Sequence, residues 1–125
     1  MKPLAHPLLS GNYLVFQLLL LCIATACRMY AVDDASLWAD ELWGVDACSQ
    51  GSWWSMIHNL IYKDSHPPGY QSMLYVWMKV FGDSDLAVRM PSVIAGVAAV
   101  AALYRLGMAY FSPVTAILAA LLLAV

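Results

Sequence analysis

The chain alternates between long apolar runs and short polar segments, and this pattern predicts helices that cross a membrane. Apolar runs occupy residues 12–32, 67–82, 89–105 and 113–125. A helix of about 20 apolar residues spans a hydrocarbon core roughly 30 Å thick. The pattern therefore predicts three full spans and the start of a fourth, with residues 33–66 as the loop after the first span. The predicted fold class is all-α, a polytopic membrane helical bundle.

Proline positions mark the predicted helix ends, because proline is tolerated in the first turn of a helix and disrupts its interior. Pro67 or Pro68 begins the second span, and a short turn at residues 105–112 ends the third. Pro113 begins the fourth, which is still apolar at Val125. We therefore expect the 125 residues to be the N-terminal part of a longer protein, forming one transmembrane domain.

Residues 33–66 differ from the rest of the chain in composition, and they are expected to lie at the membrane surface. Tryptophan prefers the headgroup level of a bilayer, where its ring is buried and its N–H stays hydrated. The loop holds six of the eight acidic residues and four of the five tryptophans, namely Asp33, Asp34, Asp40, Glu41, Asp46 and Asp64, and Trp38, Trp43, Trp53 and Trp54. This composition predicts interfacial helices within the loop.

Two such helices are predicted. Ser36 is a suitable N-cap for a first helix that runs through Gly44 or beyond, with Trp38, Leu42 and Val45 on its lipid-facing side. The second covers residues 52–61, and its predicted apolar side consists of Trp53, Trp54, Ile57 and Leu60.

Composition and charge support a membrane protein. Hydrophobic residues make up 62% of the chain and charged residues 11%, far from the balance of soluble domains. The six Lys and Arg are scattered and form no basic patch, so a nucleic-acid partner is not expected. Three cysteines, two of them in the first apolar run, imply no disulfide framework. A cleaved signal peptide is an open alternative for the first run, with Lys2 as its basic end.

The sidedness of the loop is not determined by charge. If residues 67–82 cross the membrane, the six Lys and Arg residues are divided equally between the two sides of the membrane. We expect the loop on the non-cytoplasmic side, because Lys2 precedes the first span. In this topology Arg89 is separated from Asp40 by a whole span, and it is expected to anchor a helix end.

Asp40 and Glu41 are the candidate catalytic residues, since adjacent carboxylates at a membrane need either a binding partner or a functional role. Neighbours on a helix point about 100° apart, so the two carboxylates are not expected to flank one bond as glycosidase acids do. The alternative for Asp40 is a first-turn residue favoured by the helix dipole. For Glu41 the alternatives are an orienting, hydrogen-bonding role and simple surface exposure.

Five short motifs, taken in their order along the chain, resemble those of a known family. SLWADE at residues 36–41, DSHPP at 64–68, FGDS at 81–84, RMPS at 89–92 and YRLG at 104–107 resemble membrane-embedded C-type glycosyltransferases. Among these, the resemblance is to glycosyltransferase family 39 and the protein O-mannosyltransferases. It implies a membrane enzyme that takes a sugar from a polyprenyl-phosphate donor with inversion, and an Asp-Glu pair in the first non-cytoplasmic loop.

The resemblance also implies roles for individual residues. Asp40 matches the first acid of the pair and is the predicted general base, with Glu41 in support. Asp64 and His66 are the predicted binding residues for substrate and phosphate, because they directly precede a helix N-terminus. For His66 the alternative is a histidine that fixes the loop by hydrogen bonds. A divalent metal held by Asp40, Asp64 and His66 is an open alternative, and no other cofactor is expected.

The predicted partners are a polyprenyl-phosphate sugar donor, membrane lipid and a glycan, lipid or protein acceptor. The expected location is the inner (plasma) membrane, with several spans. A non-catalytic membrane subunit is the first alternative to an enzyme. A transporter is the second, although the predicted spans contain almost no polar groups at mid-membrane.

Overall fold

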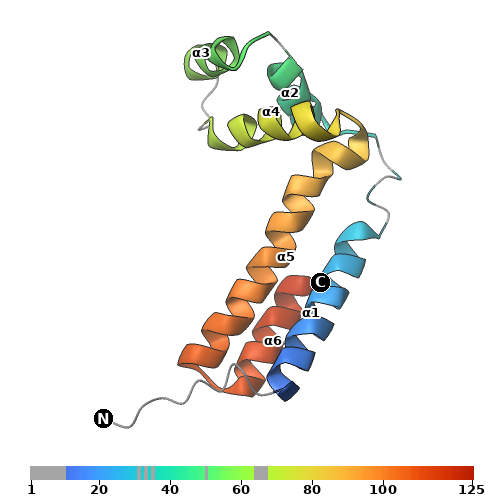
Figure 1. The fold of residues 1–125 in the computed structure, drawn as a ribbon, viewed down its shortest axis with the longest axis vertical. Coiled ribbons are helices and arrows are strands. Elements are labelled where there is room, and N and C mark those ends of the chain that lie inside the picture. The colour runs from blue at the N-terminus through green and yellow to red at the C-terminus, as the bar shows by residue number, and fades with distance from the viewer. Residues whose placement is uncertain (1–10, 31, 33, 35, 50, 64–67) are drawn as a thin grey trace. The chain divides into compact units, whose positions relative to one another are not determined.

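The computed structural model describes residues 11–30, 32, 34, 36–49, 51–63 and 68–125. All regular structure in these residues is helical, as predicted (Figure 1). The helices are α1 (Gly11–Met29), α2 (Ala39–Ser49), α3 (Trp53–Lys63), α4 (Gly69–Phe81), α5 (Asp85–Tyr110) and α6 (Pro113–Ala124). They form two compact units, and the division falls inside α5, between Pro91 and Ser92.

The first unit contains α1, α6 and α5 from Ser92 onward. Its core combines Leu20 and Ala24 of α1 with residues of α5 and with the buried alanines of α6, which are Ala116, Ala120 and Ala124. These alanines recur every fourth residue and therefore lie on one face of the helix. The helices α1 and α6 lie side by side (Figure 1), and the Tyr104 hydroxyl of α5 donates a 3.2 Å hydrogen bond to the carbonyl oxygen of Tyr13.

Among the described residues, α5 is the helix that is long and apolar enough to cross a membrane by itself. Its 26 residues extend about 39 Å at 1.5 Å per residue, which exceeds a hydrocarbon core of roughly 30 Å. The apolar segments of α1 and α6 are shorter. The predicted bundle of three full spans is therefore not confirmed.

The predicted turn at residues 105–112 is shorter than expected, because α5 continues to Tyr110 and residues 111–112 alone separate it from α6. Gly107 lies inside the helix, where a Cβ atom would come 2.7 Å from the Cα of Ala116. The glycine therefore permits close packing of α5 and α6, and it does not form a turn. The next helix begins as expected, since Pro113 is in its first turn and the Ser112 hydroxyl accepts a hydrogen bond from the Thr115 N–H.

The second unit, residues 31–91, contains α2, α3, α4 and the first turns of α5. Its core consists of Cys48, Met56, Leu60, Leu74 and Val88, one or two from each of these helices. The ring nitrogen of Trp77 donates a 2.8 Å hydrogen bond to the carbonyl oxygen of Ala87, and it thereby ties α4 to α5. This arrangement positions the candidate functional residues of α2.

The predicted membrane span at residues 67–82 is not confirmed by α4. The helix has 13 residues, or about 20 Å, which is too short for a hydrocarbon core of roughly 30 Å. It packs against α2 and α3 within the second unit. Apolar character alone does not distinguish a span from a helix of this kind, because both bury apolar side chains.

The two predicted loop helices are present, with different details. The first begins at Ala39, so Ser36 does not cap it. Trp38 and Leu42 are exposed as predicted, but Val45 packs against the core of the second unit. In the second helix, Trp53 and Trp54 are exposed, whereas Ile57 packs against the core and Leu60 is buried within it.

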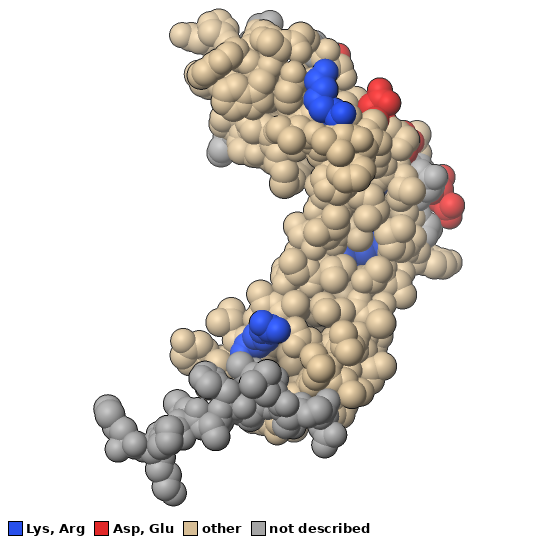
Figure 2. Space-filling view, in the orientation of Figure 1, with Lys and Arg blue, Asp and Glu red and all other residues tan. Residues whose placement is uncertain are grey.

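Both units expose apolar side chains. Leu14, Leu18 and Leu122 are more than half exposed in the first unit, as are Trp54, Tyr62 and Val80 in the second. On the face shown in Figure 2, charged side chains cover only small areas of the described surface. Exposed apolar surface of this extent is typical of proteins that contact lipid or a partner.

Candidate active site

Asp40 and Glu41 lie in the first turn of α2, and the structure places them in different environments. The side chain of Asp40 is exposed, whereas the side chain of Glu41 is 34% exposed and forms an ion pair with Arg89. The different environments of the two side chains agree with the expected separation of about 100° between neighbouring residues on a helix. Only one of the two carboxylates is therefore bound to a guanidinium group.

The Glu41 side chain caps the N-terminus of α2. Its Oε2 atom accepts a 3.0 Å hydrogen bond from the backbone N–H of Trp38, the residue before the helix. A glutamate at the third helical position often reaches back in this way, as one half of a capping box. The predicted hydrogen-bonding role of Glu41 is thus confirmed, while a catalytic role for it stays a prediction.

Arg89 makes several hydrogen bonds to α2 and to the residues before it. Its Nε donates to Glu41 Oε1 at 3.1 Å, and its Nη2 donates to Oε2 at 2.9 Å. The guanidinium therefore contacts both oxygens of one carboxylate, a geometry that its planar fork favours. The Arg89 side chain is only 12% exposed, so the pair is partly screened from water.

The same guanidinium also fixes the segment before α2. Its Nη1 donates to the carbonyl oxygen of Val32, and its Nη2 donates to the carbonyl oxygen of Ser36 at 3.1 Å. These bonds join the first turns of α5 to the residues that lead into α2. Arg89 therefore sets where α2 begins, and with it the position of Asp40.

The contact corrects the expected separation of Arg89 from the acidic pair. A membrane span between Glu41 and Arg89 would keep the two side chains on opposite sides of the bilayer, roughly 30 Å apart. They are instead 2.9 Å apart, so no bilayer lies between them. The predicted span at residues 67–82 led to the assignment of Arg89 as a helix anchor rather than as a partner of Glu41. The available signal was the resemblance itself, since Arg89 begins the RMPS motif.

The ion pair with Arg89 shifts the pKa of Glu41. The hydrogen bond from Arg89 lowers the pKa of the Glu41 carboxyl below its usual range, and the Trp38 N–H acts in the same direction. Desolvation opposes both effects, because burial favours the neutral acid. Glu41 is therefore ionised at neutral pH and serves as a fixed negative partner for Arg89.

Asp64 and His66 lie outside the described residues, so their predicted roles in binding substrate and phosphate stay predictions. The helix that follows them, α4, begins at Gly69 with Pro68 at its N-cap position. No side chain among the described residues caps this N-terminus. The first N–H groups of such a helix are available to an anion.

The described residues contain no group of three His, Cys, Asp or Glu side chains that could hold a metal ion. The set of Asp40, Asp64 and His66 is not tested by this finding, because two of its members lie outside the described part. The three cysteines, Cys22, Cys27 and Cys48, are free thiols in this structure. Cys48 is buried and its Sγ lies 3.4 Å from the carbonyl oxygen of Gln71. Burial raises the pKa of the Cys48 thiol to about 11, so it is a protonated packing residue.

Replacing Arg89 with lysine tests the contact between the arginine and the start of α2. A lysine ammonium cannot bind both Glu41 oxygens and the two carbonyl oxygens, so we expect Arg89→Lys to lower the free energy of unfolding by about 2 kcal/mol. Thermal unfolding in detergent measures the effect. Arg105→Lys is the matched control, because Arg105 is exposed, and it should leave the Tm unchanged. Equal Tm values for both variants would contradict the interpretation.

The lowered pKa of Glu41 predicts a dependence of stability on pH. A carboxyl whose pKa is lower in the folded state stabilises the fold above its unfolded value, which is 4.5 for Glu41. This contribution is lost as the pH falls from that value through the lower, folded pKa. The wild type should therefore be more stable than Glu41→Gln at pH 7, and the difference in Tm should shrink below about pH 4.5. A difference that stays constant down to pH 3 would refute the assignment.

Comparison with known families adds a match that begins after the acidic pair. Residues 65–125 match the family described as dolichyl-phosphate-mannose-protein mannosyltransferase. Searches among curated proteins and among solved structures give no match. The matched part comprises α4, α5 and α6 with Arg89, and it does not include Asp40 or Glu41. The proteins of this family are integral membrane enzymes, in agreement with the length and apolar character of α5. The resemblance drawn from the motifs is confirmed over these residues, where the chain is similar to the protein O-mannosyltransferases of the C-type glycosyltransferase class.

Proposed function

We propose that this protein is a glycosyltransferase that moves a sugar from a polyprenyl-phosphate donor to an acceptor hydroxyl, with Asp40 as the general base. The family match at residues 65–125 supports mannosyl transfer as the type of reaction. The motif at residues 36–41 supports the assignment of the base. The acceptor belongs to a protein, a lipid or a glycan.

The observation that carries the proposal is the unequal environment of the two acids. Arg89 and the Trp38 N–H hold Glu41, whereas Asp40 beside it is exposed in the first turn of the same helix. A general base must reach the proton that it removes, and its position must be fixed. Glu41 and Arg89 supply the fixed position, and Asp40 supplies the accessible carboxylate.

The proposed reaction is a single displacement. Asp40 accepts the proton of the acceptor hydroxyl, and the acceptor oxygen attacks the anomeric carbon of the donor sugar. The bond between that carbon and the phosphate oxygen breaks, and the lipid phosphate leaves with the bonding electrons. Attack from the face opposite the phosphate inverts the configuration. One carboxylate is sufficient for this reaction, in contrast to the pair that a glycosidase needs.

The donor phosphate is assigned to the segment that leads into α4. Asp64 and His66 lie in the short segment before this helix, which begins at Gly69, and helix N-termini bind anions. A histidine contributes a positive charge there when protonated. A divalent metal held by Asp40, Asp64 and His66 is the alternative means of stabilising the leaving phosphate.

The proposed setting is a membrane, with the second unit at its non-cytoplasmic surface. The exposed Trp38 and Trp54 of α2 and α3 support a position at the interface, because tryptophan side chains favour the headgroup region. The inner (plasma) membrane is the proposed location. A non-catalytic subunit with the same surface would not depend on Asp40.

Replacing Asp40 with asparagine tests the base assignment. The amide keeps the size of the side chain but cannot accept the hydroxyl proton, so we expect a loss of about 10²- to 10⁴-fold in kcat with donor binding retained. Transfer of radiolabelled mannose from a polyprenyl-phosphate donor by the protein in membranes measures this rate. Asp46→Asn changes an exposed carboxylate on the same helix and should retain the wild-type rate. A wild-type rate in Asp40→Asn would rule out Asp40 as the base and favour the non-catalytic alternative.

A further inference from the structure

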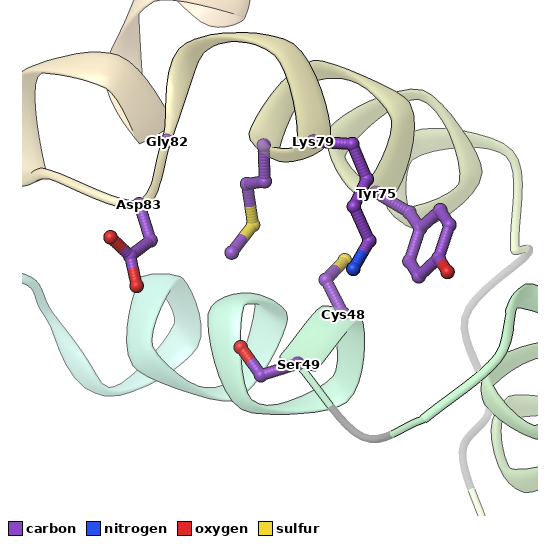
Figure 3. Close-up of a pocket in the computed structure, with 7 residues that line it drawn as sticks. Cys48, Ser49, Tyr75, Lys79, Gly82 and Asp83 are labelled. Atoms are coloured by element: carbon purple, nitrogen blue, oxygen red, sulfur yellow. The ribbon is translucent and has the colours of Figure 1, made fainter.

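A polar cavity of about 370 Å³ lies in the second unit, between the C-terminal ends of α2 and α4 (Figure 3). Its walls are formed by Cys48 and Ser49 of α2, by Tyr75, Met78 and Lys79 of α4, and by the turn at Gly82 and Asp83. The volume is near the lower end of the range for small-molecule sites, about 300–1,000 Å³. The cavity therefore suits a small ligand.

The cavity is separate from the acidic pair. Asp40 lies at the second position of α2 and Ser49 at its last, so the helix places them about 14 Å apart at 1.5 Å per residue. A ligand in the cavity is consequently not at the proposed reacting centre.

The groups that line the cavity include both donors and acceptors of hydrogen bonds. The Ser49 hydroxyl donates to the carbonyl oxygen of Val45 at 2.8 Å, which leaves the lone pairs of its oxygen for a ligand. Lys79 and Asp83 supply a cation and an anion, and Figure 3 shows both side chains on the border of the same space. No ion pair between these two side chains occurs in the described part of the chain.

An aromatic ring completes the wall. The Lys79 ammonium lies 5.4 Å from the centre of the Tyr75 ring, which keeps the lysine beside the cavity. The sulfur-containing side chains of Cys48 and Met78 provide an apolar part of the lining. An apolar and aromatic wall with a few polar groups is the usual composition of a ligand site.

The electrostatics of the cavity disfavour a charged ligand. The last residues of two helices lie beside it, and the C-terminal end of a helix carries a partial negative charge. Asp83 adds a full negative charge, so an anion such as phosphate is repelled. Lys79 adds a full positive charge, so an ion of either sign meets a like charge beside the cavity. A neutral ligand with many hydroxyl groups can use the donors and acceptors without either penalty.

We propose that this cavity is a carbohydrate-binding subsite, in which Asp83, Lys79 and Ser49 bind the hydroxyl groups of a neutral hexose unit beside the Tyr75 ring. The inference rests on the proposed function in one respect, since it identifies the acceptor as a molecule that already carries a sugar. The cavity holds that sugar away from Asp40, while a more distant hydroxyl of the acceptor receives the transferred residue.

Direct binding of simple sugars to the protein in detergent tests the proposal. The probes are methyl α-mannoside, methyl α-glucoside and methyl α-galactoside, measured by saturation-transfer difference NMR, with inorganic phosphate as the anionic comparison. We expect saturable binding of at least one glycoside and none of phosphate. Asp83→Asn and Lys79→Gln should each weaken the binding about tenfold, equivalent to roughly 1.4 kcal/mol. Both side chains are exposed, so the two variants should keep the wild-type Tm.

Two controls separate this inference from the proposed transfer reaction. Asp85→Asn changes a carboxylate two residues from Asp83 that does not line the cavity, and it should bind the glycoside as the wild type does. Asp40→Asn should also bind normally while transfer is lost. The subsite is refuted by absence of saturable binding, by unchanged binding in both Asp83→Asn and Lys79→Gln, or by preferential binding of phosphate. Failure of transfer with intact glycoside binding would count only against the proposed reaction.

Discussion

The guanidinium group of Arg89 imposes the constraint on which the second unit depends. It holds both carboxylate oxygens of Glu41 and the carbonyl oxygens of Val32 and Ser36. The contact joins the beginning of α5 to the residues before α2 and to its first turn. Because Arg89 is largely buried, removal of its partner would leave a poorly solvated charge. The ion pair therefore fixes the start of α2. Asp40 lies in the first turn of this helix, so its position is fixed as well.

Much of the fold could be predicted from local patterns. The apolar run before Met29, the tryptophan-rich helices of the loop and the proline at the start of α6 lead to helices close to those predicted. The errors arise where the same local pattern serves two different structures. The apolar run in α4 predicts a span, but packing against α2 and α3 uses the same kind of side chain. The segment at residues 105–112 predicts a turn, but α5 continues through most of it, and the missing Cβ of Gly107 admits Ala116 of another helix.

The candidate site shows the same division between local and long-range information. The different orientations of Asp40 and Glu41 follow from helix geometry alone, and the sequence predicts them. The partner of Glu41 is 48 residues further along the chain, and no periodicity connects the two. The family match covers Arg89 and not the acids, so the ion pair with Glu41 links the matched segment to the helix that carries the proposed base. The roles of Asp64 and His66 stay predictions.

From the ion pair, we expect Glu41 and Arg89 to lie on one side of the membrane, with α4 between them in the sequence but not across the bilayer. Labelling with a membrane-impermeant maleimide tests it in sealed vesicles, using single cysteines at exposed positions on either side of α4. Asp46→Cys and Asp83→Cys serve for this purpose in a background without Cys22, Cys27 and Cys48. If the ion pair forms, both cysteines should be labelled from the same side of the membrane. Labelling from opposite sides would contradict it.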